Sequence, residues 1–469
     1  MADKDIALMA HLMRRAGFGT TREELEQRVA KGYGETVEEL LHPETQPPWE
    51  EDLARRHHIG ARYGNGLPET QGWWLQRMVS TKRPLEEKMT LFWHSILCSG
   101  NAKVDHPQTM QKQIEMLRHH GLGNYRDLLS DLARDPAMII YLDNRDNHKG
   151  AINENWGREL LELFSMGVGN YTEDDVKEAS RAFTGWTHKP FPPLYPYQRY
   201  FLEFEYRPED HDDGEKVFLG QRGNFNGDDI IGIVARHPAT ARFIARHLYN
   251  FFVADEPQVP AWPHTSPRDG AAVNILADAF LQPKYDIRSV MRVLFNSDFF
   301  KDESVWYAKV KSPAEVVVGT LRLVGDYTTP KPGIDDLVIQ AGYMGQLILN
   351  PPSVEGWHSG KEWINSGSLS SRVNFVADRV GDTSLPGVQS IITRLETKSG
   401  HMSPAEFVDG CLELMGPLTV SDVTRSALIA HAEQGGELRR DTEEERGDFA
   451  RRAGRVLQLI AATREYQFA

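Results

Sequence analysis

The sequence predicts an all-α, multi-helix globular protein that carries one small β-hairpin around residues 198–220. Apolar residues recur at spacings of three and four along most of the 469-residue chain. Capping residues or proline open many of these segments, and glycine closes several of them. Convincing strand patterns occur only in YFLEFEY and KVFLG, and these two segments are the expected strands of the predicted hairpin. With 40% hydrophobic and 10% aromatic residues, the chain has ample material for a packed core.

Short helices are predicted before residue 143. The first covers residues 5–16 and ends at Gly17-Phe18-Gly19. Thr21 and Glu24 have the spacing of a capping box, which opens the second helix. The other helices expected in this part lie at residues 37–41, around Trp73 and Trp74, and at 84–97, 110–121, 124–132 and 136–143.

The segment 187–227 has a different texture, because it is first rich in Pro and Tyr and then alternates. We expect a long excursion that holds the hairpin, and connections of this length are often lids or binding loops. A second irregular segment, rich in Pro, Gly, Ser and Trp, is expected at 349–370. Further helices are expected at 228–236, 238–253, 271–282, 287–295, 313–324, 337–345, 388–397, 404–415, 421–433 and 442–463.

Two domains are predicted. Residues 1–385 form a main helical domain that includes the β-hairpin insertion at 187–227. Residues 386–469 form a C-terminal helical subdomain packed on the first.

The most polar helical pattern lies between Asp143 and Trp186, in DNRDNHKGAINENWGRELLELFSMGVGNYTEDDVKEASRAFTGW. On a helical wheel five polar residues fall within about 140° of one another, opposite an apolar half. Thr172 and Asp175 have the spacing of a capping box and open a second helix. The five polar residues are Glu154, Asn155, Arg158, Glu159 and Glu162.

This polar stripe has two interpretations. Glu154, Arg158 and Glu162 at i, i+4 and i+8 are typical of a solvated ion-pair ladder, worth a few tenths of a kcal/mol per pair. Alternatively the stripe faces a cleft, and Arg158 orients the carboxylates or an anionic substrate group. The amide-rich entrance at Asp143, Asn144 and the residues that follow favours the second interpretation.

Four further candidates lie outside the stripe. His94 projects opposite the apolar face of helix 84–97, and His211 with Asp212 lies between the two expected strands. Trp357 lies in the irregular segment 349–370, where it either walls a ligand pocket or packs the loop onto the helices.

The chain resembles a bacterial family known only as domain of unknown function 1800. The resemblance rests on HLMRRAGFG from His11, EKMTLFWHS around His94, NENWGRELLELF with GVGNYTEDDVKEASRAFTGW, HDDGEKVFLGQRGNFNG, PPSVEGWHSGKEWIN and the closing REYQFA. It covers nearly the whole chain. The family implies a fold and no settled activity; many of its members look exported, and they often accompany a sulfatase- or phosphatase-like protein.

Composition and missing motifs narrow the function. A net charge of −14 argues against a nucleic-acid partner, and no apolar run is long enough for a membrane span. No signal peptide is visible, so the chain is expected to be cytoplasmic, or exported if a leader was removed. Two cysteines do not make a disulfide framework, and no nucleotide, flavin or haem motif is present. Carboxylate and histidine chemistry remains, and these groups also suit a hard divalent cation, although the pattern specifies no metal ligands.

The sequence therefore supports two hypotheses and sets no oligomeric state. In the first, the protein is a hydrolase or lyase whose cleft acts on a polar substrate such as a carbohydrate. In the second, it is a non-catalytic binding or scaffold partner of a sulfatase- or phosphatase-like protein, and the polar stripe is structural. Under the first hypothesis the catalytic candidates are Glu154, Glu162, Glu159, Asp143, His94 and His211, and the substrate-binding candidates are Arg158, Asn144, Asn153, Asn155, Asp212, Trp186 and Trp357.

Overall fold

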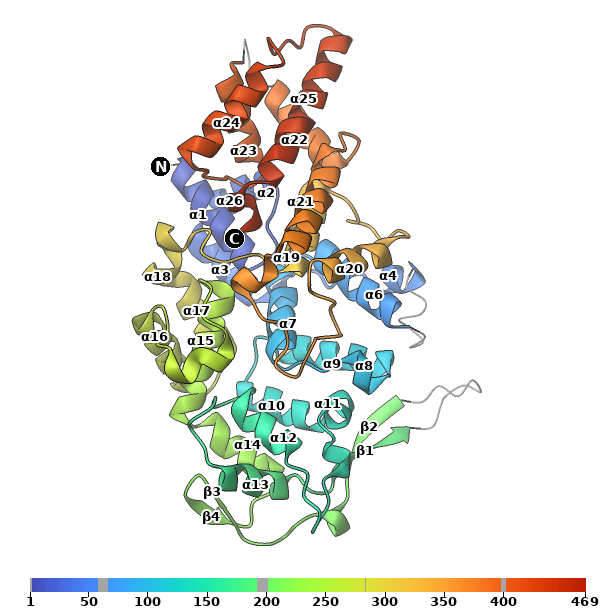
Figure 1. The fold of residues 1–469 in the computed structure, drawn as a ribbon, viewed down its shortest axis with the longest axis vertical. Helices are drawn as coiled ribbons and strands as arrows, with labels where there is room; N and C mark the ends of the chain where they lie inside the picture. The colour runs from blue at the N-terminus through green and yellow to red at the C-terminus, as the bar shows by residue number, and fades with distance from the viewer. Residues whose placement is uncertain (1, 58–65, 192–200, 283, 398–401) are drawn as a thin grey trace.

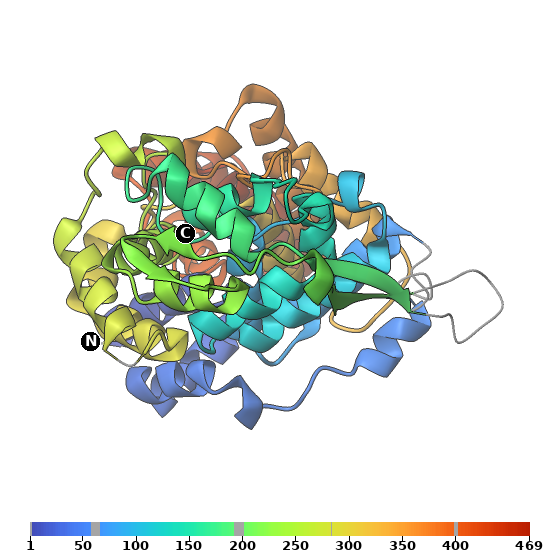
Figure 2. The same ribbon diagram turned by 90° about the horizontal axis from the view of Figure 1, so that it is seen from below.

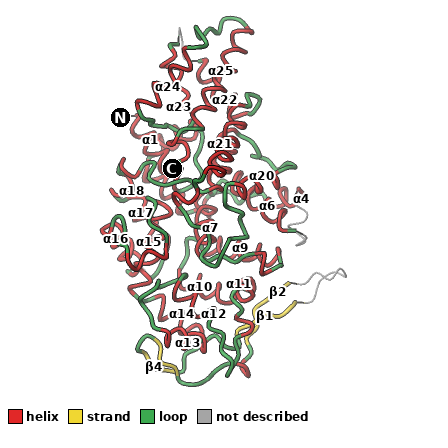
Figure 3. Tube along the Cα trace, in the orientation of Figure 1, coloured by secondary structure: helices red, strands yellow, loops and turns green. Residues whose placement is uncertain are grey.

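The computed structural model describes residues 2–57, 66–191, 201–282, 284–397 and 402–469. These residues are mainly helical, which confirms the predicted fold class (Figure 1). The C-terminal helices occupy one end of the long axis, and the central polar block with the strands occupies the other. Figure 3 shows that helix dominates between them.

The helices of the first part include every predicted one, and Glu51–His57 and Asn101–Val104 are two short helices that were not predicted. They are α1 (Ala2–Arg15), α2 (Arg22–Lys31), α3 (Tyr33–Leu41), α4 (Glu51–His57), α6 (Leu67–Ser80), α7 (Pro84–Ile96), α8 (Asn101–Val104), α9 (Pro107–His120), α10 (Tyr125–Arg134), α11 (Pro136–Tyr141), α12 (Asn155–Glu162) and α13 (Glu173–Ala182).

Three of the helices that follow the strands were not predicted by the sequence analysis, namely Asp298–Lys301, Ser366–Gly381 and Arg464–Gln467. Helix α21 begins inside the segment expected to be irregular, where Asn365 caps it and forms a capping box with Ser368. The helices are α14 (Gly227–Ala235), α15 (Pro238–Phe252), α16 (Gly270–Leu281), α17 (Ile287–Asn296), α18 (Asp298–Lys301), α19 (Pro313–Val324), α20 (Ile334–Tyr343), α21 (Ser366–Gly381), α22 (Pro386–Glu396), α23 (Pro404–Leu414), α24 (Asp422–Glu433), α25 (Glu443–Ala461) and α26 (Arg464–Gln467).

The strands lie where the excursion was predicted, but their pairing differs. Strand β2 (Phe201–Tyr206) pairs antiparallel with β1 (Trp186–Phe191), and the ribbon projects from the helices in two perpendicular views (Figures 1 and 2). The expected pairing of β2 with the KVFLG segment is wrong. That segment instead holds β3 (Lys216–Phe218), which pairs with β4 (Gln221–Gly223). Proline within β1 hid this strand from the sequence pattern, since proline usually argues against a strand.

Helix α7 lies at the centre of the core. Phe92 packs against Trp93 and Phe251 with ring centroids 4.7 and 5.2 Å apart, and Trp93 stacks on Tyr125 at 5.7 Å. The Trp93 indole N–H donates to the Gly121 carbonyl over 3.0 Å, so its polar atom is satisfied inside the core. Aromatic pairs of this kind contribute about 0.5–1.5 kcal/mol each beyond their buried area.

The C-terminal helices α23, α24 and α25 pack on one another, and α25 also packs along α21 (Figure 1). The division at residue 385 stays a prediction. Among the residues that the structure describes, no helix is long and apolar enough to cross a membrane.

Candidate active-site cleft

Helix α12 is held against α13 by a close backbone approach at Gly157. A Cβ atom added there would lie 2.2 Å from the Ser180 hydroxyl oxygen and 3.0 Å from the Val176 carbonyl oxygen. The helix is shorter than the wheel assumed, because Glu154 is its N-cap residue. The polar residues at the start of α12 lie at the protein surface, whereas Glu162 at its end lies at a cleft.

The outer edge of α12 is a surface ion-pair ladder. The Arg158 guanidinium lies 3.3 Å from Glu154 and 2.7 Å from Glu173 on α13. Three-quarters of the Glu173 side chain is exposed, so solvent weakens these pairs to a few tenths of a kcal/mol. Glu154 and Arg158 therefore match the first of the two interpretations of the stripe.

The inner edge of α12 faces a cleft. Glu162 lies in its wall together with Leu163 and Glu355, and the cleft has a volume of about 550 Å³. The Tyr171 hydroxyl donates to the Glu162 carboxylate over 3.0 Å. Sites for small molecules commonly enclose about 300–1,000 Å³, so the cleft is large enough for one.

Glu159 is the most perturbed carboxyl of α12. Burial raises its pKa to about 7, and the negative charges of Glu162 and Glu355 act in the same direction, against the opposing effect of Arg158. Glu159 therefore interacts electrostatically with Glu162 and Glu355, the two carboxyl groups that line this wall. A carboxyl with such a pKa carries a proton for part of the time at neutral pH, so it can serve as an acid.

The 353–363 segment adds a histidine between two carboxylates. His358 places Nδ1 2.6 Å from Glu362 and Nε2 3.3 Å from Glu355. The hydrogen bond to Glu362 raises the pKa of His358, and that to Glu355 adds to the effect. Gly356 has a φ of +80°, and a Cβ there would lie 2.3 Å from the Ser95 carbonyl oxygen, which fixes this segment against the end of α7.

Another part of the cleft is aromatic and basic. Trp262, in the 3₁₀ helix Val259–His264, lies beneath the Arg246 guanidinium at 4.5 Å and beside His247 at 4.6 Å. Glu256 binds Arg246 at 2.7 Å, so this arginine is fixed. Arg242, one turn earlier on α15, is exposed at the rim and forms no hydrogen bond or ion pair with any described residue.

A smaller cavity of about 80 Å³ adjoins the cleft. The two share Leu163, Val259, Pro260 and Glu355 in their walls. Trp357 and Lys309 line only the smaller one. Trp357 thus lies beside the proposed cleft, within reach of the same wall.

The amide-rich entrance is a buried structural network. The Asn144 side-chain amide donates to the Trp186 carbonyl over 2.8 Å, and Asn147 donates to the Ser180 carbonyl over 2.8 Å. The Asn147 side-chain oxygen accepts from the Asn153 backbone N–H over 3.1 Å. These groups join the loop before α12 to α13 and β1, and none of them lines the cleft.

Several other predicted site residues lie at separate places. Asp143 pairs with Lys103 at 2.7 Å. His211 donates to the Thr184 carbonyl over 2.9 Å, and Arg181 holds Asp212 through two hydrogen bonds that lower the pKa of Asp212 to about 2. These contacts connect the segment between β2 and β3 to α13.

The remaining predicted residues serve the core or the helix start. The His94 Nε2 accepts from the Leu349 backbone N–H over 3.1 Å, and complete burial lowers the pKa of His94 to about 3. Trp186 is buried beneath the Arg134 guanidinium at 4.5 Å. Asn153 accepts from the Asn155 backbone N–H over 3.0 Å, which orders the start of α12.

Sequence reasoning did not identify Arg242, Arg246, Trp262 or Glu355 as site residues. The arginines follow a helical pattern that equally suits a solvated face, and Trp262 lies in a proline-rich segment without periodicity. Glu355 lies within the PPSVEGWHSG motif, but nothing in the spacing connects that motif to α12. Their meeting is a product of the tertiary structure.

A family model described as Protein of unknown function (DUF1800) matches residues 11–468. The chain belongs to this family. Comparison with curated proteins and with solved structures finds no match. The DUF1800 match spans α12, α15 and the 353–363 segment, so every wall of the cleft belongs to the family's own domain.

Metal-ligating residues do not gather in the described part of the chain. Among those residues, no three or more His, Cys, Asp or Glu side chains are arranged to hold a metal ion.

Proposed function

We propose that the protein is an enzyme, a hydrolase or lyase, that uses carboxyl acid–base chemistry in the cleft between α12, α15 and the 353–363 segment. The observation that carries the proposal is the position of Glu159, half-buried behind Glu162 and Glu355, the two carboxyl groups that line a 550 Å³ cleft and raise its pKa. Strongly shifted carboxyl pKa values are typical of catalytic acids.

The roles follow from the surroundings of each group. Glu159, with a pKa of about 7, donates a proton to a leaving group. Glu162, oriented by the Tyr171 hydroxyl, acts as the base. Glu154 is not part of this proposal, because it belongs to the outer ladder with Arg158.

The aromatic and basic part of the cleft supports a substrate that has a polar ring and an anionic group. Trp262, fixed between Arg246 and His247, offers a flat face on which a sugar ring can stack. Arg242 has no partner among the described residues and can bind a carboxylate with two parallel hydrogen bonds. An acidic carbohydrate, such as a uronic acid glycoside, satisfies both features.

A direct test is turnover of fluorogenic uronic acid glycosides and of their neutral counterparts by the wild-type protein. Glu159→Gln and Glu162→Gln are expected to lower kcat at least about a hundredfold, the range for loss of a general acid or base. Glu173→Gln, which changes an exposed carboxylate of the outer ladder, is the matched control and is expected to keep full activity. Arg242→Gln is expected to raise KM for the acidic glycosides and to leave the neutral ones unchanged.

Equal turnover by wild type, Glu159→Gln and Glu162→Gln would contradict the proposal. Turnover of neutral and acidic glycosides with the same KM would contradict the assignment of Arg242. The two results are independent, because the first concerns proton transfer and the second concerns binding.

The second hypothesis, a non-catalytic partner of a sulfatase- or phosphatase-like protein, is favoured by one specific observation. The buried amides of Asn144 and Asn147 are satisfied by backbone carbonyls, as expected of a rigid scaffold. Binding of such a partner with unchanged affinity by Glu159→Gln, together with no turnover by wild type, would favour this alternative.

A further inference from the structure

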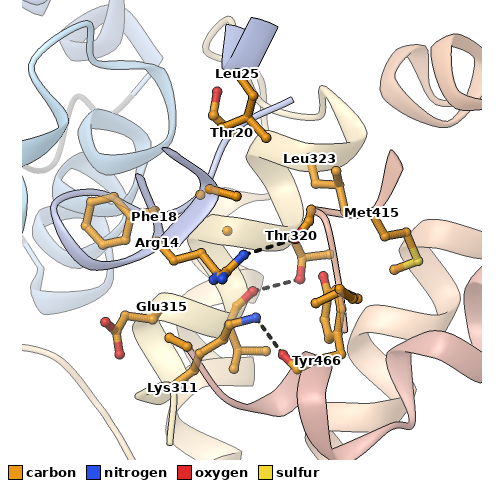
Figure 4. Close-up of a pocket in the computed structure, with 17 residues that line it drawn as sticks. Arg14, Phe18, Thr20, Leu25, Lys311, Glu315, Thr320, Leu323, Met415 and Tyr466 are labelled. Carbon is orange, nitrogen blue, oxygen red and sulfur yellow. Dashed lines mark hydrogen bonds between the residues drawn. The ribbon is translucent and has the colours of Figure 1, made fainter. Parts of the chain in front are cut away.

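A third cavity lies at the contact of α1, α19 and the C-terminal segment (Figure 4). Its volume is about 60 Å³, which is room for a few water molecules or one small oxyanion. Arg14 and Lys311 lie in its wall, together with Thr320 and Tyr466. We call it the junction cavity.

Cationic side chains exceed carboxylates around the junction cavity. Two carboxylates, Glu315 and Asp255, face this group of charges. The cations that surround them, all largely buried, are Arg14, Arg15, Lys88, Lys309, Lys311 and Arg372. Buried charges are costly unless they are paired, so this excess favours a further anion.

Neither carboxylate is free to balance the excess. Glu315 accepts hydrogen bonds from Lys88, from Lys309 at 3.2 Å and from the Ser312 backbone N–H at 2.6 Å. Asp255 accepts from the Val310 backbone N–H over 2.8 Å, and burial raises the pKa of Asp255. Glu315 is thus already paired with two lysines, Lys88 and Lys309.

Three of the arginines, Arg14, Arg15 and Arg372, have buried N–H groups that donate no hydrogen bond. Arg14 donates to the Gly416 carbonyl over 3.0 Å, and its buried Nε has no partner. Arg15 donates from Nη2 to the Val305 carbonyl, which leaves Nε and Nη1 without partners, and Arg372 keeps Nε and Nη2 without partners. Of these arginines Arg14 reaches the cavity itself, between α1 and α19 (Figure 4).

The charges around Lys311 are also mainly positive. Its ammonium group donates to the Tyr466 carbonyl over 2.5 Å. Burial, followed by the nearby charge of Arg14, lowers its pKa to about 7. An anion in the cavity would stabilise the charged form of this lysine.

We propose that the junction cavity binds one small tetrahedral oxyanion, inorganic phosphate or sulfate, through Arg14 and Lys311. Thr320 and Tyr466 place hydroxyl groups at the same wall. The cavity lies between α1, α19 and the segment that contains Met415, Gly416 and Tyr466, so the bound anion joins these parts of the chain.

The test is calorimetric titration of the full chain with inorganic phosphate and, separately, with sulfate, at constant ionic strength set by chloride. Saturable binding with one site per chain is expected, with a rise in Tm of several degrees at saturation. Lys311→Met is expected to weaken the Kd at least tenfold. Lys177→Met removes an exposed lysine of α13 outside the cavity and is expected to leave the Kd unchanged.

No saturable heat for either anion on the wild-type chain overturns the proposal, whatever the variants do. Equal Kd values for wild type and Lys311→Met also overturn it, because the anion would then bind elsewhere. Arg14→Gln is the second variant. If it does not fold, Lys311→Met and the wild-type titration still decide the outcome, because Lys311 lies outside α1 and its replacement leaves that helix unchanged.

Discussion

Replacement of Glu159 by glutamine is expected to stabilise the fold at alkaline pH. The rise of its pKa from 4.5 to about 7 corresponds to about 3 kcal/mol against the ionised form. Because the side chain is partly exposed, solvent screening leaves about 1–2 kcal/mol. Glutamine has nearly the same shape and carries no charge, so it removes this cost.

The pH dependence gives the sign of the effect. Below pH 4.5 the carboxyl is protonated in both the folded and the unfolded chain, so it contributes no difference. Between pH 4.5 and about 7 the folded state binds more protons than the unfolded state, and the free energy of unfolding falls as pH rises. Above pH 7 the whole cost is present, so Glu159→Gln gains its full advantage there.

The measurement is a pair of thermal or denaturant melts of wild type and Glu159→Gln at pH 4.5 and pH 8. At pH 8 the variant is expected to unfold at a temperature higher by about 2 °C, and at pH 4.5 the two curves are expected to coincide. Glu173→Gln, at the outer ladder, is the control and is expected to show no gain at pH 8. A variant that is less stable than wild type at pH 8, or equally shifted at both pH values, would refute the reasoning.

Three further predictions concern the scaffold, each checked by denaturant melts. Gly157→Ala is expected to cost about 2 kcal/mol or more, because its Cβ would overlap Ser180, whereas Gly34→Ala in α3, with open space, is expected to gain about 0.5–1 kcal/mol. Glu87→Gln is expected to cost about 3–5 kcal/mol, because it leaves the buried charge of Arg118 without its carboxylate; an unchanged melt would contradict this. Asn144→Ala is expected to cost about 1–3 kcal/mol, because the buried backbone carbonyls of Trp186 in β1 and of Phe183, the C-cap residue of α13, would lose this donor.

Local sequence signals account for most of the helices. Thr172 with Asp175 forms the capping box predicted at the start of α13, and Pro84 and Pro313 lie in the first turns of α7 and α19. The hairpin partner was missed because the sequence of β1 contains Pro190, and register is set by a partner that sequence does not reveal. Local chemistry therefore predicts helix ends better than strand pairing.

The candidate site was predicted only in part, for a geometric reason. The polar residues between 154 and 162 share one stripe on the wheel, but in the structure Arg158 pairs with Glu154 and Glu173 on the outside while Glu162 faces the cleft. A helical wheel reports which residues share a face and contains no information on what that face meets. Glu355 and Arg242 lie 193 and 80 residues beyond Glu162, as the numbering shows, and only the packing of α15 and the 353–363 segment brings them to it.

One buried ion pair connects the two cavities. Lys309 lines the small cavity beside the cleft, and Glu315, whose carboxylate lies 3.2 Å from it, lines the junction cavity. An oxyanion bound by Arg14 and Lys311 adds negative charge next to Glu315, which disfavours its ionised form and weakens its competition for Lys309. If both sites bind as proposed, phosphate in the junction cavity is expected to change the KM for acidic glycosides, and Lys311→Met is expected to abolish that change. An unchanged KM across a saturating phosphate titration would mean that the Lys309–Glu315 pair separates the sites rather than coupling them.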